Sequence, residues 1–190
     1  MSEVQAPVHE WTVHEWTRQE YERMVAAGVF HPRERVELVD GEVVDMTPQT
    51  SQHSTAVQLL QEALRAAFTE GYVIRVQMPL ALDLRSEPEP DIAVVAGNAV
   101  DFRDAHPDAA VLVVEVADSS LAYDRTEKAR IYAMNGIADY WIVNLVDNCV
   151  EVHRDPGGGE YRNVSSYRPD DRVFPLRNPA GSIEISAILS

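Results

Sequence analysis

Cysteine and lysine are almost absent from this chain of 190 residues. The single cysteine, Cys149, excludes an internal disulfide framework and fits a reducing compartment. The N-terminus has neither the basic nor the apolar segment of a secretory signal, and no apolar run approaches the ~20 residues that a membrane span needs. We therefore expect a soluble, cytoplasmic protein that makes no contact with a membrane.

Positive charge is also scarce, with 16 Lys and Arg against 31 Asp and Glu and a formal net charge of −15. This balance argues against a broad basic surface for nucleic acid. It leaves room for a small site at which bound cations reverse the local field. Lys128 is the only lysine, and it has two interpretations: a functional point charge, or a surface residue paired with Asp124 one helical turn earlier.

The length and the 45% hydrophobic content suit one domain with a sizeable core. Residues 8–17 repeat the pentapeptide VHEWT, and only its second copy leads into a predicted helix. Thr17 and Glu20 have the spacing of a capping box, which predicts a helix over 18–27. We expect residues 1–16 to be an N-terminal tail and residues 17–190 to be a single domain.

Hydrophobic periodicity and turn residues predict the remaining elements. Strands and helices alternate in the middle of the chain, and a hairpin stands toward each end. This order predicts an α/β (α+β) fold with a mixed sheet flanked by helices. The predicted elements are hairpins at 35–46 and at 150–154 with 161–167, helices at 50–70 and 124–135, strands at 72–77, 92–95, 111–117 and 140–145, an extended run at 80–84, and a short element at 183–189.

Two carboxylates occupy unusual positions in this pattern. Asp91 stands at the start of one apolar strand, and Glu115 lies inside the next. If these strands pair, the two carboxylates converge and repel each other unless a cation lies between them. Oxygen ligands suit Mg²⁺ or Mn²⁺, and with Lys128 nearby the set fits hydrolysis of a phosphodiester. The alternative is structural, with Asp91 in a turn and Glu115 at a sheet edge.

The order Pro90-Asp91, Glu115, lysine resembles the PD-(D/E)XK signature of the restriction-endonuclease-like superfamily. More closely, the chain is similar to a large bacterial branch of restriction endonucleases that was formerly a domain of unknown function. The resemblance covers most of residues 17–190. It is carried by residues 37–42, 87–95, 113–116, 119–120, 123–125, 128, 131–133 and 140–143.

The resemblance implies a role for several residues. Asp91 and Glu115 would bind the metal, with the Val116 carbonyl as a further ligand. Lys128 would be the catalytic cation, because the superfamily's lysine falls here at Ala117 and this branch supplies its lysine from the following helix. The resemblance also implies a catalytic role for an early acidic residue, Glu37, and supporting roles for Gln77 and Asp124.

His53 lies near the start of a predicted helix. It has two interpretations, a general base and a packing or cap residue, and the second is favoured. The sequence contains no Gly-x-Ser-x-Gly elbow and no phosphate-binding glycine pattern.

The leading hypothesis is a Mg²⁺-dependent DNA endonuclease, with Mn²⁺ as a second candidate ion. One alternative is a catalytically silent module of the same fold that binds DNA or a protein partner. Another is a metal-dependent phosphoesterase acting on a small substrate. The sequence leaves open which DNA is cut, how many metals act and whether the protein is a dimer. A homodimer would suit paired cuts, with Tyr140-Trp141 or the C-terminal hairpin as its interface.

Overall fold

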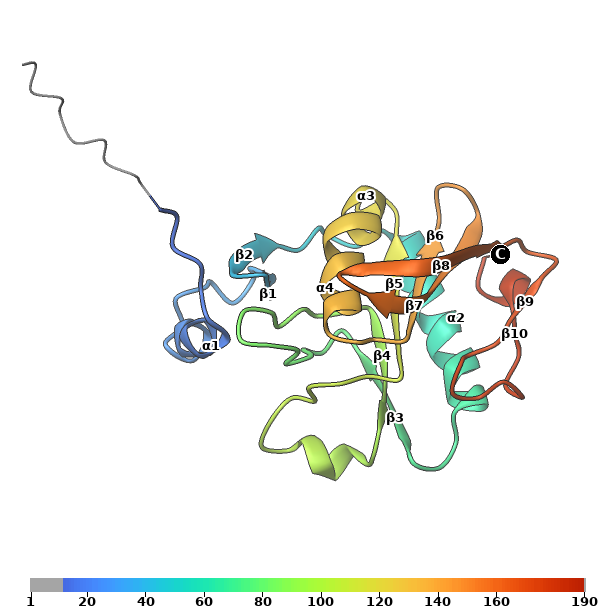
Figure 1. Ribbon diagram of the computed structural model, residues 1–190, viewed down its shortest axis with the longest axis horizontal. Coiled ribbons are helices and arrows are strands. Elements are labelled where there is room, and N and C mark those ends of the chain that lie inside the picture. Colours follow the sequence, from blue (N-terminus) through green and yellow to red (C-terminus); the bar gives the residue numbers. More distant parts are fainter. Residues whose placement is uncertain (1–11, 190) are drawn as a thin grey trace, which may run out of the picture.

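The computed structural model describes residues 12–189, in which a six-stranded mixed sheet has helices on both faces (Figure 1). The first copy of the VHEWT repeat, up to Trp11, lies outside the described residues. Helix α1 (Arg18–Ala26) has the predicted capping box between Thr17 and Glu20. The division into a tail and one domain stays a prediction. Within residues 12–189, no helix is both long and apolar enough to cross a membrane.

The sheet has the order β3-β4-β5-β6-β7-β8, in which β5 and β6 are parallel and all other neighbours are antiparallel. The three central strands are buried on both faces, which explains why their sequences are almost continuously apolar. The strands are β3 (Tyr72–Val76), β4 (Ile92–Ala96), β5 (Leu112–Ala117), β6 (Asp139–Asn144), β7 (Cys149–Gly157) and β8 (Glu160–Tyr167).

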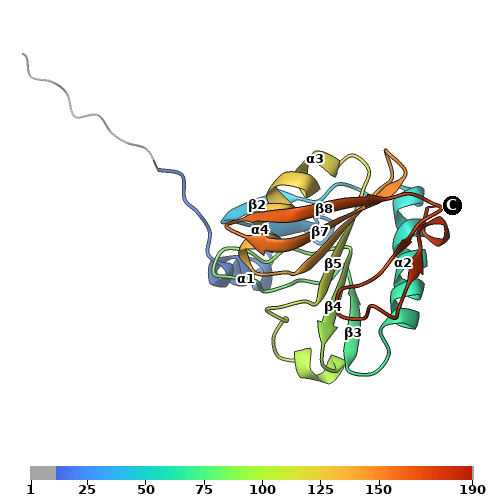
Figure 2. The same ribbon diagram turned by 45° about the vertical axis from the view of Figure 1, so that its right-hand side comes forward.

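Two apolar layers hold helices against this sheet. Helix α2 (Ser51–Ala67) packs Leu60 and Leu64 on one face. Helix α4 (Ala129–Met134) packs Ile131 and Tyr132 on the other, and Figure 2 shows the sheet between the two helices. The hairpin of β1 (Val36–Val39) and β2 (Glu42–Asp45) joins the α4 side. Outside the connection from β5 to β6, the remaining elements are η1 (Ala99–Phe102), β9 (Arg172–Val173), β10 (Ile183–Glu184) and η3 (Ile185–Ala187).

The connection from β5 to β6 differs from the single helix predicted over 124–135. It starts earlier and has three parts: α3 (Leu121–Tyr123), the π-helix η2 (Asp124–Lys128) and α4. A four-residue step in a regular α-helix overshoots a full turn by about 40°. In η2 the Ala129 N–H donates to the Asp124 carbonyl, so the turn contains more residues than an α-helical turn. This wider turn reduces the angular offset between residues four apart. Ser120, Asp124, Lys128 and Tyr132 therefore share one face of the connection.

Most predicted elements are present with ends shifted by a few residues, but three details were wrong. Residues 80–84 are not one extended run, because the chain bends at 83–85, although Leu80, Ala81 and Leu82 are buried. Strand β7 runs through Pro156, so that the hairpin turns at Gly158-Gly159 rather than over 155–159. Tyr140 and Trp141 are fully buried inside the chain, which removes them as a dimer interface.

Candidate active site

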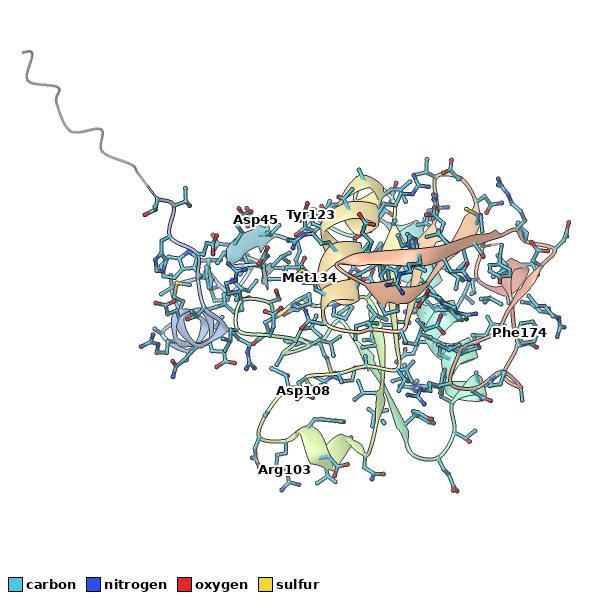
Figure 3. The ribbon with its side chains drawn as sticks, in the orientation of Figure 1. Asp45, Arg103, Asp108, Tyr123, Met134 and Phe174 are labelled. Carbon is cyan, nitrogen blue, oxygen red and sulfur yellow. The ribbon has the colours of Figure 1, made fainter. Side chains whose placement is uncertain are left out.

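A cleft of about 290 Å³ opens where β4 begins and β5 ends. The β1–β2 hairpin, the start of α2 and the helical connection after β5 form its walls. Figure 3 shows two lining residues, Asp45 and Tyr123, at this end of the molecule. Its charged lining is unbalanced, because the described residues supply two cations, Arg35 and Lys128, against seven carboxylates: Glu37, Asp45, Glu89, Asp91, Glu115, Asp118 and Asp124.

Asp91 and Glu115 meet because β4 and β5 pair antiparallel, with Ile92 opposite Val114. The Asp91 N–H donates to Glu115 Oε2 at 3.1 Å, and the Val116 N–H donates to Asp91 Oδ2 at 2.9 Å. Main-chain bonds thus fix both carboxylates.

The Val116 carbonyl lies on the cleft side of β5. Its neighbour Ala117 faces β6, because the Ala117 carbonyl accepts from Leu145 N–H at 2.9 Å. Successive residues of a strand direct their polar groups to opposite edges. The Val116 carbonyl is therefore directed to the same edge as its N–H, where Asp91 lies.

Two further side chains hold the Asp91 carboxylate. Gln77 Nε2 donates to Oδ1 at 3.0 Å, and His53 Nε2 lies 3.0 Å from Oδ2. Burial acts to raise the pKa of Asp91, but these contacts and the Val116 N–H outweigh it and lower the pKa. The packing interpretation of His53 was incomplete, because this side chain contacts the candidate site. No spacing in the sequence connects position 53 with position 91.

Lys128 lies at the base of the cleft with only 5% of its side chain exposed. Its Nζ donates to Glu37 Oε2 at 2.7 Å and to Glu115 Oε1 at 3.2 Å. Burial alone would lower the pKa of Lys128, but these carboxylates raise it. The surface pair with Asp124 does not form within residues 12–189, since the Asp124 carboxylate instead accepts from Ser120 Oγ at 2.6 Å.

Tyr132 completes the surroundings of Glu115. Its hydroxyl is fully buried and donates to Glu115 Oε1 at 2.7 Å. The sequence resemblance included Tyr132 but gave it no role. Its position four residues after Lys128, on the same helical face, was the available signal.

The cleft holds more negative charge than its cations neutralise. Burial, reinforced by the neighbouring carboxylates, raises the pKa of Glu115 to about 8 and that of Asp124 to about 6. Within residues 12–189, no three His, Cys, Asp or Glu side chains form a ligand cluster. A metal here would rest on two carboxylates, a main-chain oxygen and water, which is a common arrangement for Mg²⁺.

The fold and the site together define a restriction-endonuclease-like α/β core. A crystal structure described as a putative nuclease belonging to DUF820, from Anabaena variabilis ATCC 29413, is similar, with a TM-score of 0.71 and 12% sequence identity. The match covers 91% of this chain and 97% of that one. No curated protein sequence matches the chain.

The family model described as "Uma2: Putative restriction endonuclease" matches residues 18–184. The chain belongs to the Uma2 family. This membership confirms the superfamily and the bacterial branch expected from the sequence.

Proposed function

We propose that this protein is a Mg²⁺-dependent endonuclease that hydrolyses phosphodiester bonds in DNA. The observation that carries the proposal is the contact of Glu115 with both Asp91 and Lys128 at the base of an acidic cleft. Membership in a family described as restriction endonucleases supports the reaction class. Mn²⁺ is the second ion that this set of oxygen donors suits.

Asp91, Glu115 and the Val116 carbonyl would hold the metal. When bound, the ion lowers the pKa of an attacking water and stabilises negative charge on the phosphate. Gln77 and His53 keep the Asp91 carboxylate in one orientation. Tyr132 does the same for Glu115.

Lys128 is the proposed catalytic cation. Its ammonium group lies beside Glu115, where it neutralises charge that develops on the phosphate or orients the water. Glu37 accepts from the same ammonium group and fixes its position. Asp124 lies on the same helical face and adds to the field that keeps Lys128 protonated.

The test is cleavage of plasmid and branched DNA with Mg²⁺ or Mn²⁺. Asp91→Asn and Lys128→Ala should each lower the rate by on the order of 10²–10³-fold, the effect of removing one group that stabilises a transition state. Asp108→Asn is the matched control, because Asp108 is an exposed carboxylate far from the cleft (Figure 3). Wild-type rates in Asp91→Asn and Lys128→Ala would overturn the proposal.

The acidic surface favours two alternative functions, a silent binding module and a phosphoesterase for small substrates. Both can be tested on the same purified protein. A silent module predicts that calorimetry detects no uptake of Mg²⁺, even with DNA present. A phosphoesterase for small substrates predicts hydrolysis of small phosphodiesters without cleavage of DNA. Either result would replace the proposed endonuclease activity.

A further inference from the structure

Arg35 is the cation of the cleft wall that is free to change partners. The other cation, Lys128, is held by two buried carboxylates. Arg35 has 41% of its side chain exposed, and its contact with Glu89 Oε2 measures 3.5 Å. That distance is long for a guanidinium–carboxylate pair, which normally closes to about 2.7–2.9 Å. An exposed pair of this kind contributes little stability.

The β1–β2 hairpin fixes where Arg35 stands. The Arg35 carbonyl accepts a hydrogen bond from Met46 N–H at 2.8 Å, which extends the hairpin pairing by one residue. Residues two apart on a strand face the same side. Arg35 and Glu37 therefore both face the cleft, with Arg35 about 6.6 Å further along the strand.

Glu89 and Asp91 are also two residues apart, like Arg35 and Glu37. The two are separated by Pro90 in an extended segment, and both line the cleft. The Glu89 N–H donates to Glu37 Oε2 at 2.9 Å, which ties this segment to β1. The cleft thus has an inner row, Glu37 and Asp91 with Lys128, and an outer row formed by Arg35 and Glu89.

We propose that Arg35 binds a phosphate of the DNA strand next to the phosphate that is cleaved, and that this phosphate displaces Glu89. The inference rests on the proposed function. A guanidinium group pairs with phosphate through two parallel hydrogen bonds, which the present contact with Glu89 does not provide. Glu89 would hold Arg35 in place until the substrate arrives.

The test compares Arg35→Ala with Arg103→Ala, which removes an exposed arginine far from the cleft (Figure 3). Cleavage of a labelled oligonucleotide is followed in Mg²⁺, and binding is followed by fluorescence anisotropy in EDTA, between about 50 and 200 mM salt. Arg35→Ala should raise KM about tenfold and change kcat less than twofold. It should also make the salt dependence of binding shallower by about 1 in log–log slope. Arg103→Ala should match wild type.

Two variants separate charge from geometry. Arg35→Lys keeps the charge but loses the paired hydrogen bonds, so its KM should fall between wild type and Arg35→Ala. Glu89→Gln removes the competing carboxylate and should tighten binding by about two- to fivefold. An Arg35→Ala protein with wild-type KM and salt slope overturns this inference and leaves the nuclease proposal standing. A wild-type protein that neither binds nor cleaves DNA overturns both.

Discussion

Glu115 and Asp139 are both buried carboxylates in adjacent parallel strands, yet their surroundings are opposite. Asp139 is fully satisfied: Oδ1 accepts from Trp141 Nε1 and Arg154 Nε, each at 2.8 Å, and Oδ2 accepts from Leu176 N–H at 2.7 Å. Arg154 contacts no other carboxylate within residues 12–189. Asp139 therefore has a counter-ion of its own.

Glu115 shares its counter-ion. Lys128 pairs with both Glu37 and Glu115, and Asp91 adds another negative charge beside them. Burial and these neighbours raise the pKa of Glu115 to about 8. Burial of a carboxylate therefore does not by itself identify a site. The distinguishing feature is a local excess of negative charge that the cations among residues 12–189 do not balance.

The largest expected effect is the difference in cleavage rate between variants that lack the counter-ion of Glu115, Lys128, or that of Asp139, Arg154. Lys128→Ala should lower the cleavage rate by on the order of 10²–10³-fold. Arg154→Ala should cut DNA within about threefold of wild type but lose about 3 kcal/mol of unfolding free energy, because Asp139 is left without its partner. Cleavage assays at 25 °C measure the rates of both variants, and urea denaturation measures their unfolding free energies. Equal losses of activity would remove the distinction between the two carboxylates.

The second prediction concerns pH and added Mg²⁺. The raised pKa values of Asp124, about 6, and Glu115, about 8, stabilise the metal-free protein fully below their ordinary values near 4. That stability is lost as the pH rises through about 6 to 8. The lowered pKa of Asp91 has the opposite effect on stability. Its contribution is present at neutral pH and is lost only as the pH falls into the acid range.

Since bound Mg²⁺ needs its ligand Glu115 ionised, it should raise the melting temperature more at pH 8.5 than at pH 6. The gain is at most about 1.4 kcal/mol per pH unit for each proton displaced. Thermal melts with and without Mg²⁺ at each pH measure this gain in stability. Arg154→Ala is the control and should show the same pH trend. A Mg²⁺ effect that shrinks with rising pH would contradict the proposed metal ligands.

The smallest effect should follow from deleting one hydroxyl. Tyr132→Phe removes the hydrogen bond to Glu115 Oε1 and should weaken Mg²⁺ binding and cleavage about tenfold, the lower end for groups that support metal ligands. Tyr161→Phe loses one hydrogen bond as well, to the Ile137 carbonyl at 2.8 Å, and should affect stability alone. Calorimetric titration with Mg²⁺ tells them apart, and unchanged Mg²⁺ affinity in Tyr132→Phe would show that Glu115 needs no such support.

Sequence reasoning predicted the parts of the site that depend on strand order. Asp91 directly precedes β4 and Glu115 lies in β5, so their approach follows from the pairing of these strands. The placement of Lys128 came from the family resemblance. The alternation pattern predicted that the two hairpins form, although it misplaced the turn of the second.

Other contacts depend on geometry that the sequence does not encode locally. His53 reaches Asp91 across 38 positions, and Arg35 reaches Glu89 across 54. Tyr140 and Trp141 were a candidate dimer interface, whereas layers on both sides of the sheet bury them. The π-helix was not predicted, because hydrophobic periodicity near 3.6 residues per turn indicates a helix without resolving one wider turn inside it.

That π-helix has a consequence for comparing this chain with its relatives. Ser120, Asp124, Lys128 and Tyr132 recur every four residues, whereas a regular α-helix would keep the same face with spacings of four, three and four. Relative to such a helix, the chain carries one additional residue between Asp124 and Lys128. An alignment with a relative whose helix is regular there needs a one-residue gap at this point. Without the gap, Lys128 would be matched to the wrong column.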